Sequence, residues 1–309
     1  MPDIIFHHFQ SSPFSEKIRL IFGYKKLAWK SVIVPVIMPK PDVVALTGGY
    51  RRTPILQIGA DVYCDTALIA DVLERIAPLP TLYPVASAGV ARTLAQWADS
   101  TLFWTVIAYT FQPAGLQSMF GHLTPEQMKA FGADRALLRG SAPRMAVAEA
   151  TGQLQEYVRR LEQMLIGGEP YLLGGLPTIA DFSVYHPIWY LRNAKAVSGI
   201  LDAAPKLLAW ADRMAALGHH EFTTISSEQA LAIARDSKPA AIAGSPFVDT
   251  HGVALGDRVA IQPTDYGVDP VEGELVLAVD NEFAVQRSDE RAGTVVVHFP
   301  RVGFQLKKI

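Results

Sequence analysis

Hydrophobic and polar residues follow two alternating patterns over the first 80 residues of the chain. Short β-favouring runs occupy residues 3–9, 31–37, 54–58 and 61–64. Apolar residues with the three- and four-residue spacing of a helix cover residues 13–26 and 65–77. The Gly-Ala-Asp sequence at 59–61 predicts a tight hairpin between the last two strands. The expected order is β-α-β, a loop, then β-β-α.

Two segments interrupt this regular alternation. Pro35 falls inside the run at 31–37, and because proline cannot donate to a strand ladder, it indicates an edge position or a bulge there. Residues 38–52 are rich in proline, glycine and basic side chains, which predicts a loop.

The pattern changes twice more along the chain. After a proline-rich linker at 78–84, it is helical from 87 to about 236. From 244 to 309, five short apolar runs are separated by turn residues, which predicts a small β-barrel or sheet. We therefore expect an α/β domain at 1–80, an all-helical domain at 85–238 and, after a linker at 238–246, a separate small β-domain at 244–309.

Composition narrows the possible partners. Charged residues make up 19% of the 309 residues, below the roughly 25% of an average domain, which indicates additional buried surface such as a subunit interface. The formal charge is −2 with no basic stripe, so we expect no nucleic-acid partner. The last 66 residues carry 10 acidic and 6 basic side chains, which also disfavours phosphate-backbone binding.

Cysteine usage and hydropathy indicate a cytoplasmic protein. Cys64 is the single cysteine, so an internal disulfide and a cysteine-based zinc site are excluded. The N-terminus reads as a strand rather than a secretory signal, and no apolar run is long enough to predict a membrane span. His7 and His8 are adjacent on a predicted strand and point to opposite faces, so we expect no metal site.

The first candidate chemistry lies where the first strand meets the first helix, at Ser11, Ser12, Pro13 and Ser15. A serine N-cap followed by proline is an ordinary helix start. The same geometry also suits a thiolate, because a helix N-terminus has unpaired N–H groups and a positive dipole end. A free thiol has a pKa of about 8.5 and needs such help to ionise at neutral pH.

Two further segments are candidates for ligand binding. At Arg52-Thr53-Pro54, a cis bond before the proline would turn the main chain of Thr53 outward to pair with a peptide, and the arginines would meet a carboxylate. The alternative is a solvated basic loop. At Asp65-Thr66, the next helix begins, and its N-terminus would hold a carboxylate; the alternative is simple capping.

Taken together in this order, the three motifs resemble the glutathione-transferase superfamily. The resemblance implies a thioredoxin-like α/β domain followed by an all-α domain, with glutathione as a substrate. It also implies that Ser12, or Ser11 or Ser15, activates the glutathione thiol. Arg52, Thr53, Pro54, Asp65 and Thr66 would hold the rest of the tripeptide. Serine in place of cysteine in the Ser-Pro-Phe motif argues against disulfide exchange of the glutaredoxin type.

The helical half supports the resemblance. Thr178 and Asp181 match a capping box at the start of a central helix, a structural role. Asp99 is a candidate for the glutathione amino group, and aromatic residues on the same helix (Phe103, Trp104, Tyr109 and Phe111) are candidates for the electrophile pocket. The resemblance covers about residues 1–237 and leaves the C-terminal segment outside it.

Two functions remain open from the sequence. The first is a detoxifying transferase that presents the glutathione thiolate to a small apolar electrophile or peroxide. The second is a non-catalytic binding or assembly module whose β-domain recruits a partner, since a fold does not fix a function. The resemblance implies a homodimer in either case.

Overall fold

The computed structural model describes residues 3–142, 144–241 and 246–309 of the chain. The first elements follow the expected order, with one extra helix: β1 (Ile5–His8), α1 (Pro13–Lys25), β2 (Trp29–Ile33), α2 (Pro41–Thr47), β3 (Ile55–Ile58), β4 (Asp61–Cys64) and α3 (Thr66–Ile76). Strand β1 pairs with β2 in parallel and with β3 in antiparallel orientation, and the β3–β4 hairpin closes at Ile58 and Asp61. This confirms the thioredoxin-like arrangement.

Two details of this part differ from the sequence prediction. Strand β2 ends at Ile33, so Pro35 lies outside it, and β2 is an interior strand between β1 and β5 rather than an edge. The segment predicted as a loop contains α2, which begins at Pro41 and ends against Gly48 in the left-handed region, with φ of 80°. Proline at the first turn and glycine at the C-cap are helix-boundary signals that composition alone conceals.

The second part is helical, as predicted: α4 (Ala88–Trp97), a π-helical turn (Ala98–Leu102), α5 (Phe103–Thr110), α6 (Pro113–Phe120), α7 (Pro125–Arg139), α8 (Val147–Met164), α9 (Ile179–Asn193), a 3₁₀ turn (Ser198–Leu201), α10 (Pro205–Ala215) and α11 (Ser227–Asp236). A short strand that the pattern did not predict, β5 (Phe222–Thr224), pairs with β2. Within the described ranges, no helix is both long and apolar enough to cross a bilayer.

The C-terminal segment forms the five expected strands: β6 (Arg258–Pro263), β7 (Val271–Ala278), β8 (Glu282–Asp289), β9 (Gly293–Pro300) and β10 (Phe304–Lys308). They were expected in a unit of their own. Instead, β9 pairs with β4 in parallel, and all the strands form one sheet in the order β10-β6-β7-β8-β9-β4-β3-β1-β2-β5. Pairing β4 with β9 satisfies backbone groups that β4 would otherwise expose as an edge strand. Residues 242–245 of the expected linker lie outside the described residues.

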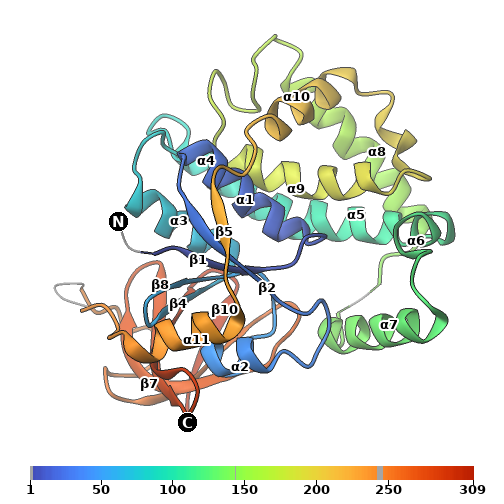
Figure 1. Ribbon diagram of the computed structural model, residues 1–309. Helices are drawn as coiled ribbons and strands as arrows, with labels where there is room; N and C mark the ends of the chain where they lie inside the picture. The colour runs from blue at the N-terminus through green and yellow to red at the C-terminus, as the bar shows by residue number, and fades with distance from the viewer. Residues whose placement is uncertain (1–2, 143, 242–245) are drawn as a thin grey trace.

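Helices pack on both faces of this sheet (Figure 1), and its two larger hydrophobic cores lie on opposite faces. On one face, α1 and α3 pack between the sheet and the helical domain. On the other face, α2 and α11 cover the sheet, and side chains of the C-terminal strands belong to the same core. Helix α11 contacts both α2 and β9, so it joins the C-terminal strands to the first domain.

Candidate functional site

A cavity of about 400 Å³ lies where α1, α3 and α4 meet the segment before β3. Its walls include Lys17 from α1, Arg52 and Thr53, and Asp65 and Thr66 at the start of α3. The C-terminal part closes another side through residues 264–266. The cavity therefore lies between all three parts of the chain.

At the start of α1, Ser12 is the N-cap residue and is 2% exposed. Its Oγ accepts a hydrogen bond from the N–H of Ser15 at 3.1 Å, which leaves its own proton available to a ligand. Ser15 is fully buried, and its hydroxyl has no hydrogen-bond partner among the described residues. Ser11 is exposed. None of the three serines lines the cavity, whereas Phe14, between them in sequence, does.

A buried lysine lines the cavity. Lys17 is fully buried, and its Nζ lies 2.6 Å from Asp99 Oδ2 and 3.1 Å from Thr66 Oγ1. A lysine is rarely buried unless its charge is paired. This pair links α1, the start of α3 and the helical domain in one hydrogen-bonded network.

The π-helical turn between α4 and α5 presents Asp99 to this network. Such turns are rare in proteins overall, and many of those that occur lie at functional sites. His186 Nε2 lies 2.9 Å from Asp99 Oδ1, and because a carboxylate only accepts, the imidazole donates from Nε2. Desolvation opposes ionisation of Asp99, but Lys17 and His186 hold its pKa below the ordinary range. Burial lowers the pKa of His186, although the Asp99 carboxylate opposes this shift.

The segment before β3 carries an unpaired main chain. The Thr53–Pro54 peptide bond is cis, and the N–H and C=O of Thr53 make no hydrogen bond to any described residue. Lys40 is 3% exposed and donates from Nζ to Thr53 Oγ1 at 3.0 Å. Burial lowers the pKa of Lys40 to about 8. The free main-chain groups of Thr53 are suited to pairing with a peptide ligand.

Helix α3 begins at the cavity wall. Asp65 is its N-cap, accepts a hydrogen bond from the N–H of Ala67 at 2.9 Å, and has φ of 74°. Strained backbone of this kind is concentrated at ligand-binding sites. Desolvation raises the pKa of Asp65, although the Ala67 N–H, Arg52 and Lys17 oppose it. The first turn of α3 thus offers N–H groups and a carboxylate to a zwitterionic ligand.

Arg52 is already engaged by the C-terminal part of the chain. Its guanidinium donates to the Asp265 carboxylate and to the carbonyl of Tyr266, and it stacks 3.7 Å from the centroid of the Tyr266 ring. No sequence pattern indicates this contact, because Asp265 is 213 positions further along the chain.

The structure thus brings together the five residues expected to hold the tripeptide, which all line the cavity: Arg52, Thr53, Pro54, Asp65 and Thr66. It also adds residues that the sequence did not single out. The sequence does contain a signal for Lys17, because this lysine lies on the buried side of an amphipathic helix. Asp265 and Tyr266 carried none.

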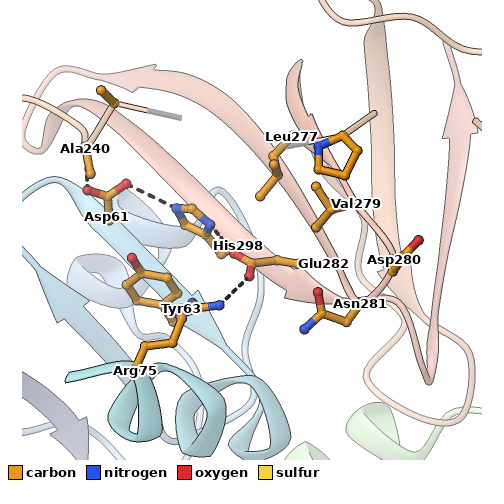
Figure 2. Close-up of a pocket in the computed structure, with 12 residues that line it drawn as sticks. Asp61, Tyr63, Arg75, Ala240, Leu277, Val279, Asp280, Asn281, Glu282 and His298 are labelled. Carbon is orange, nitrogen blue, oxygen red and sulfur yellow. Dashed lines mark hydrogen bonds and ion pairs between the residues drawn. The ribbon is translucent and has the colours of Figure 1, made fainter. Parts of the chain in front are cut away.

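A second cavity, of about 440 Å³, lies between β4 and the C-terminal strands (Figure 2). His298 lies between two carboxylates, with Nε2 3.1 Å from Asp61 Oδ1 and Nδ1 2.7 Å from Glu282 Oε1. Arg75 pairs with Glu282 at 3.2 Å. These charged groups pair with one another, and the pairs join the C-terminal strands to the first domain. Over the described residues, no group of three or more His, Cys, Asp or Glu is arranged to hold a metal ion.

Comparisons with known proteins agree with this fold. Residues 6–81 match the family model of the glutathione S-transferase N-terminal domain, and residues 144–213 match that of the C-terminal domain. A search of curated proteins found no match.

Solved structures give the same result over a larger part of the chain. A GST-like protein from Pseudomonas syringae is 40% identical, with a TM-score of 0.84 and full coverage of both chains. It therefore matches the C-terminal strands as well. A Tau class glutathione S-transferase from mango, Mangifera indica, is 16% identical with a TM-score of 0.53, over 69% of this chain and 89% of its own. A glutathione S-transferase from Methylobacterium radiotolerans, solved with glutathione sulfonate, is 17% identical with a TM-score of 0.50, over 72% and 97%. The last two show the fold alone.

Proposed function

Because the chain belongs to the glutathione S-transferase superfamily, we propose that it binds glutathione in the cavity beside α1 and α3 and activates its thiol. The thiolate forms a bond to the electrophilic centre of a small apolar substrate or peroxide, and the leaving group departs. The nucleophile comes from the tripeptide rather than from the protein.

The observation that carries this proposal is the convergence of three kinds of group on one cavity. The unpaired main chain of Thr53 suits the cysteinyl main chain of a tripeptide, as in strand addition. The first turn of α3, with Asp65 and Thr66, suits the amino and carboxylate groups of the γ-glutamyl end. Arg52 suits the glycyl carboxylate.

We assign thiol activation to Ser12, which is buried behind Phe14, the neighbouring residue that lines the cavity. Its hydroxyl proton is free to donate, and it stands at the positive end of α1. The neighbouring Phe14 lines the cavity and packs 4.7 Å from Phe103 and 4.5 Å from His186, measured between ring centroids. The Phe14 ring, held by these two buried neighbours, gives the apolar electrophile a surface beside the thiol.

Titration calorimetry with glutathione tests the proposal on the wild type, Thr66→Ala and Ser12→Ala. We expect micromolar to millimolar binding by the wild type, weaker binding by Thr66→Ala, and a raised pKa of the bound thiol in Ser12→Ala. Thr151→Ala is the matched control, because its hydroxyl is exposed on α8 and bonds only to the carbonyl of Val147. No heat and no protection from unfolding at millimolar glutathione would instead favour the non-catalytic binding module.

The proposal includes a homodimer, as the resemblance implies. Val85 is fully exposed and Val90 is 60% exposed, before and on α4, which leaves apolar surface for a second subunit. Light scattering at micromolar concentration checks this, and a monomeric mass would contradict it.

A further inference from the structure

The connection between β6 and β7 lies against the proposed glutathione site. Gly267 N–H donates to the carbonyl of Leu138 on α7 at 2.6 Å. The Tyr266 ring packs edge-on against Trp104 of α5, with centroids 5.0 Å apart. The same ring stacks on Arg52. Residues 264–267, which we call the β6–β7 loop, therefore contact both other parts of the chain.

The carboxylate of Asp265 lies where an anionic ligand would be held. Arg52 lines the cavity, and its guanidinium donates to Asp265 and to the Tyr266 carbonyl. The Nε of Arg52 is buried and has no hydrogen-bond partner among the described residues. A guanidinium binds a carboxylate best through two parallel N–H groups. Asp265 accepts from only one terminal nitrogen of Arg52, so this ion pair lacks the two parallel N–H contacts that a guanidinium can make.

The two partners of this ion pair differ in exposure. The side chain of Arg52 is 10% exposed, whereas that of Asp265 is 49% exposed. The arginine is thus enclosed in the cavity wall, whereas the aspartate can return to water. Displacing Asp265 leaves no buried carboxylate without a partner, which makes exchange for another carboxylate feasible.

We propose that Asp265 is a specificity-determining residue of this site, which occupies the carboxylate position at Arg52 until a ligand carboxylate displaces it. The inference rests on the proposed function, because it takes glutathione as the ligand. Glutathione with a free glycyl carboxylate would displace the β6–β7 loop and gain a two-nitrogen contact. A ligand without that carboxylate would leave Arg52 paired with Asp265.

Calorimetry on Asp265→Asn provides the test, with two probes. Glutathione should bind Asp265→Asn about three- to tenfold more tightly than it binds the wild type. The reason is that the Asp265 carboxylate no longer competes for Arg52, so a larger fraction of the protein is ready to bind. Glutathione esterified at the glycyl carboxylate should bind the variant and the wild type equally. Asp269→Asn is the charge-matched control, since Asp269 is exposed in the same connection and makes no ion pair with the described residues. It should bind both probes as the wild type does.

A second measurement reports on the loop directly. Hydrogen exchange at the Gly267 amide should be slow in the free wild type, and faster in free Asp265→Asn and in the wild type with glutathione. Unchanged or weaker glutathione binding by Asp265→Asn would overturn the inference while leaving the proposed function intact. Absence of glutathione binding by both proteins would overturn the proposed function and this inference together. Binding by the variant alone would support the inference in its strongest form.

Discussion

The ammonium group of Lys17 lies 2.6 Å from the carboxylate of Asp99, inside the proposed glutathione site. Lys17 is fully buried, whereas the Asp99 side chain is 20% exposed. The pair joins α1 to the π-helical turn after α4, which are 82 positions apart in sequence. It therefore ties the position of the first helix to the helical domain.

Replacing Lys17 with methionine should destabilise the protein by about 3 kcal/mol, because it leaves the Asp99 carboxylate without its cationic partner. The pKa of Asp99 should rise towards its ordinary range. Urea unfolding measures the free energy. The double variant Lys17→Met with Asp99→Leu is the control and should regain part of the loss. A loss in the single variant below about 1 kcal/mol, the range of an exposed pair, would contradict the prediction.

The three serines near α1 should separate into distinct roles. Ser12→Ala removes the N-cap acceptor for Ser15 N–H, so it should cost about 1 kcal/mol of stability. It should also raise the pKa of bound glutathione, measured by thiolate absorbance against pH. Ser11→Ala is the exposed control, and Ser15→Ala removes a hydroxyl without a partner among the described residues. If either of these raises the thiol pKa more than Ser12→Ala does, Ser12 is wrongly assigned.

Asp181 should be among the most sensitive positions in the helical domain. Its carboxylate accepts from the N–H of Thr178 at 2.8 Å, from the N–H of Leu172 at 2.9 Å and from the indole of Trp210 at 3.0 Å. Asp181→Ala leaves buried donors unpaired, and each costs about 1–3 kcal/mol. Asp181→Asn keeps one acceptor oxygen, which can serve Leu172 and Trp210, but places an amide donor against the N–H of Thr178, so it should lose less than Asp181→Ala. Thermal unfolding of the two variants, compared at one pH, distinguishes loss of hydrogen bonds from loss of volume.

The pairing of His298 should make stability depend on pH. Burial lowers the pKa of His298, but Asp61 and Glu282 outweigh it, and the pKa is raised above 6.5 in the folded state. The stabilisation of the folded state by protonated His298 is complete below pH 6.5, and it is lost as the pH rises through the raised pKa. Desolvation also opposes ionisation of Glu282, yet His298 lowers its pKa below 4.5, so that contribution is lost as the pH falls.

His298→Gln should therefore be most destabilising at mildly acidic pH, with a difference from the wild type that shrinks at alkaline pH. Denaturant unfolding over a pH series measures it. Arg75→Gln is the control at the same network, because Arg75 is 53% exposed and such pairs contribute about 0–1 kcal/mol. A difference for His298→Gln that grows with pH would contradict the raised pKa.

Local sequence patterns correctly predict the elements whose structure depends on residues close together in the chain. Periodicity predicted α1 and α3, and the glycine-containing turn predicted the β3–β4 hairpin, whose register confirms it. The capping residues at Thr178 and Asp181 are in place at the start of α9. The composition of the segment does not predict α2, because proline and glycine are typical of loops and here mark the two ends of a short helix, at Pro41 and Gly48.

By itself, the sequence determined the secondary structure of most elements, the thioredoxin-like and helical arrangement, and the motif residues later found in the cavity wall. These depend on hydrogen bonds and apolar spacing within a few turns of chain. Only the tertiary structure decided that β9 joins β4, that Lys17 meets Asp99, and that Asp265 lies on Arg52. Those contacts join residues tens to hundreds of positions apart, and an ion pair leaves no periodic signal in either of the segments that it connects.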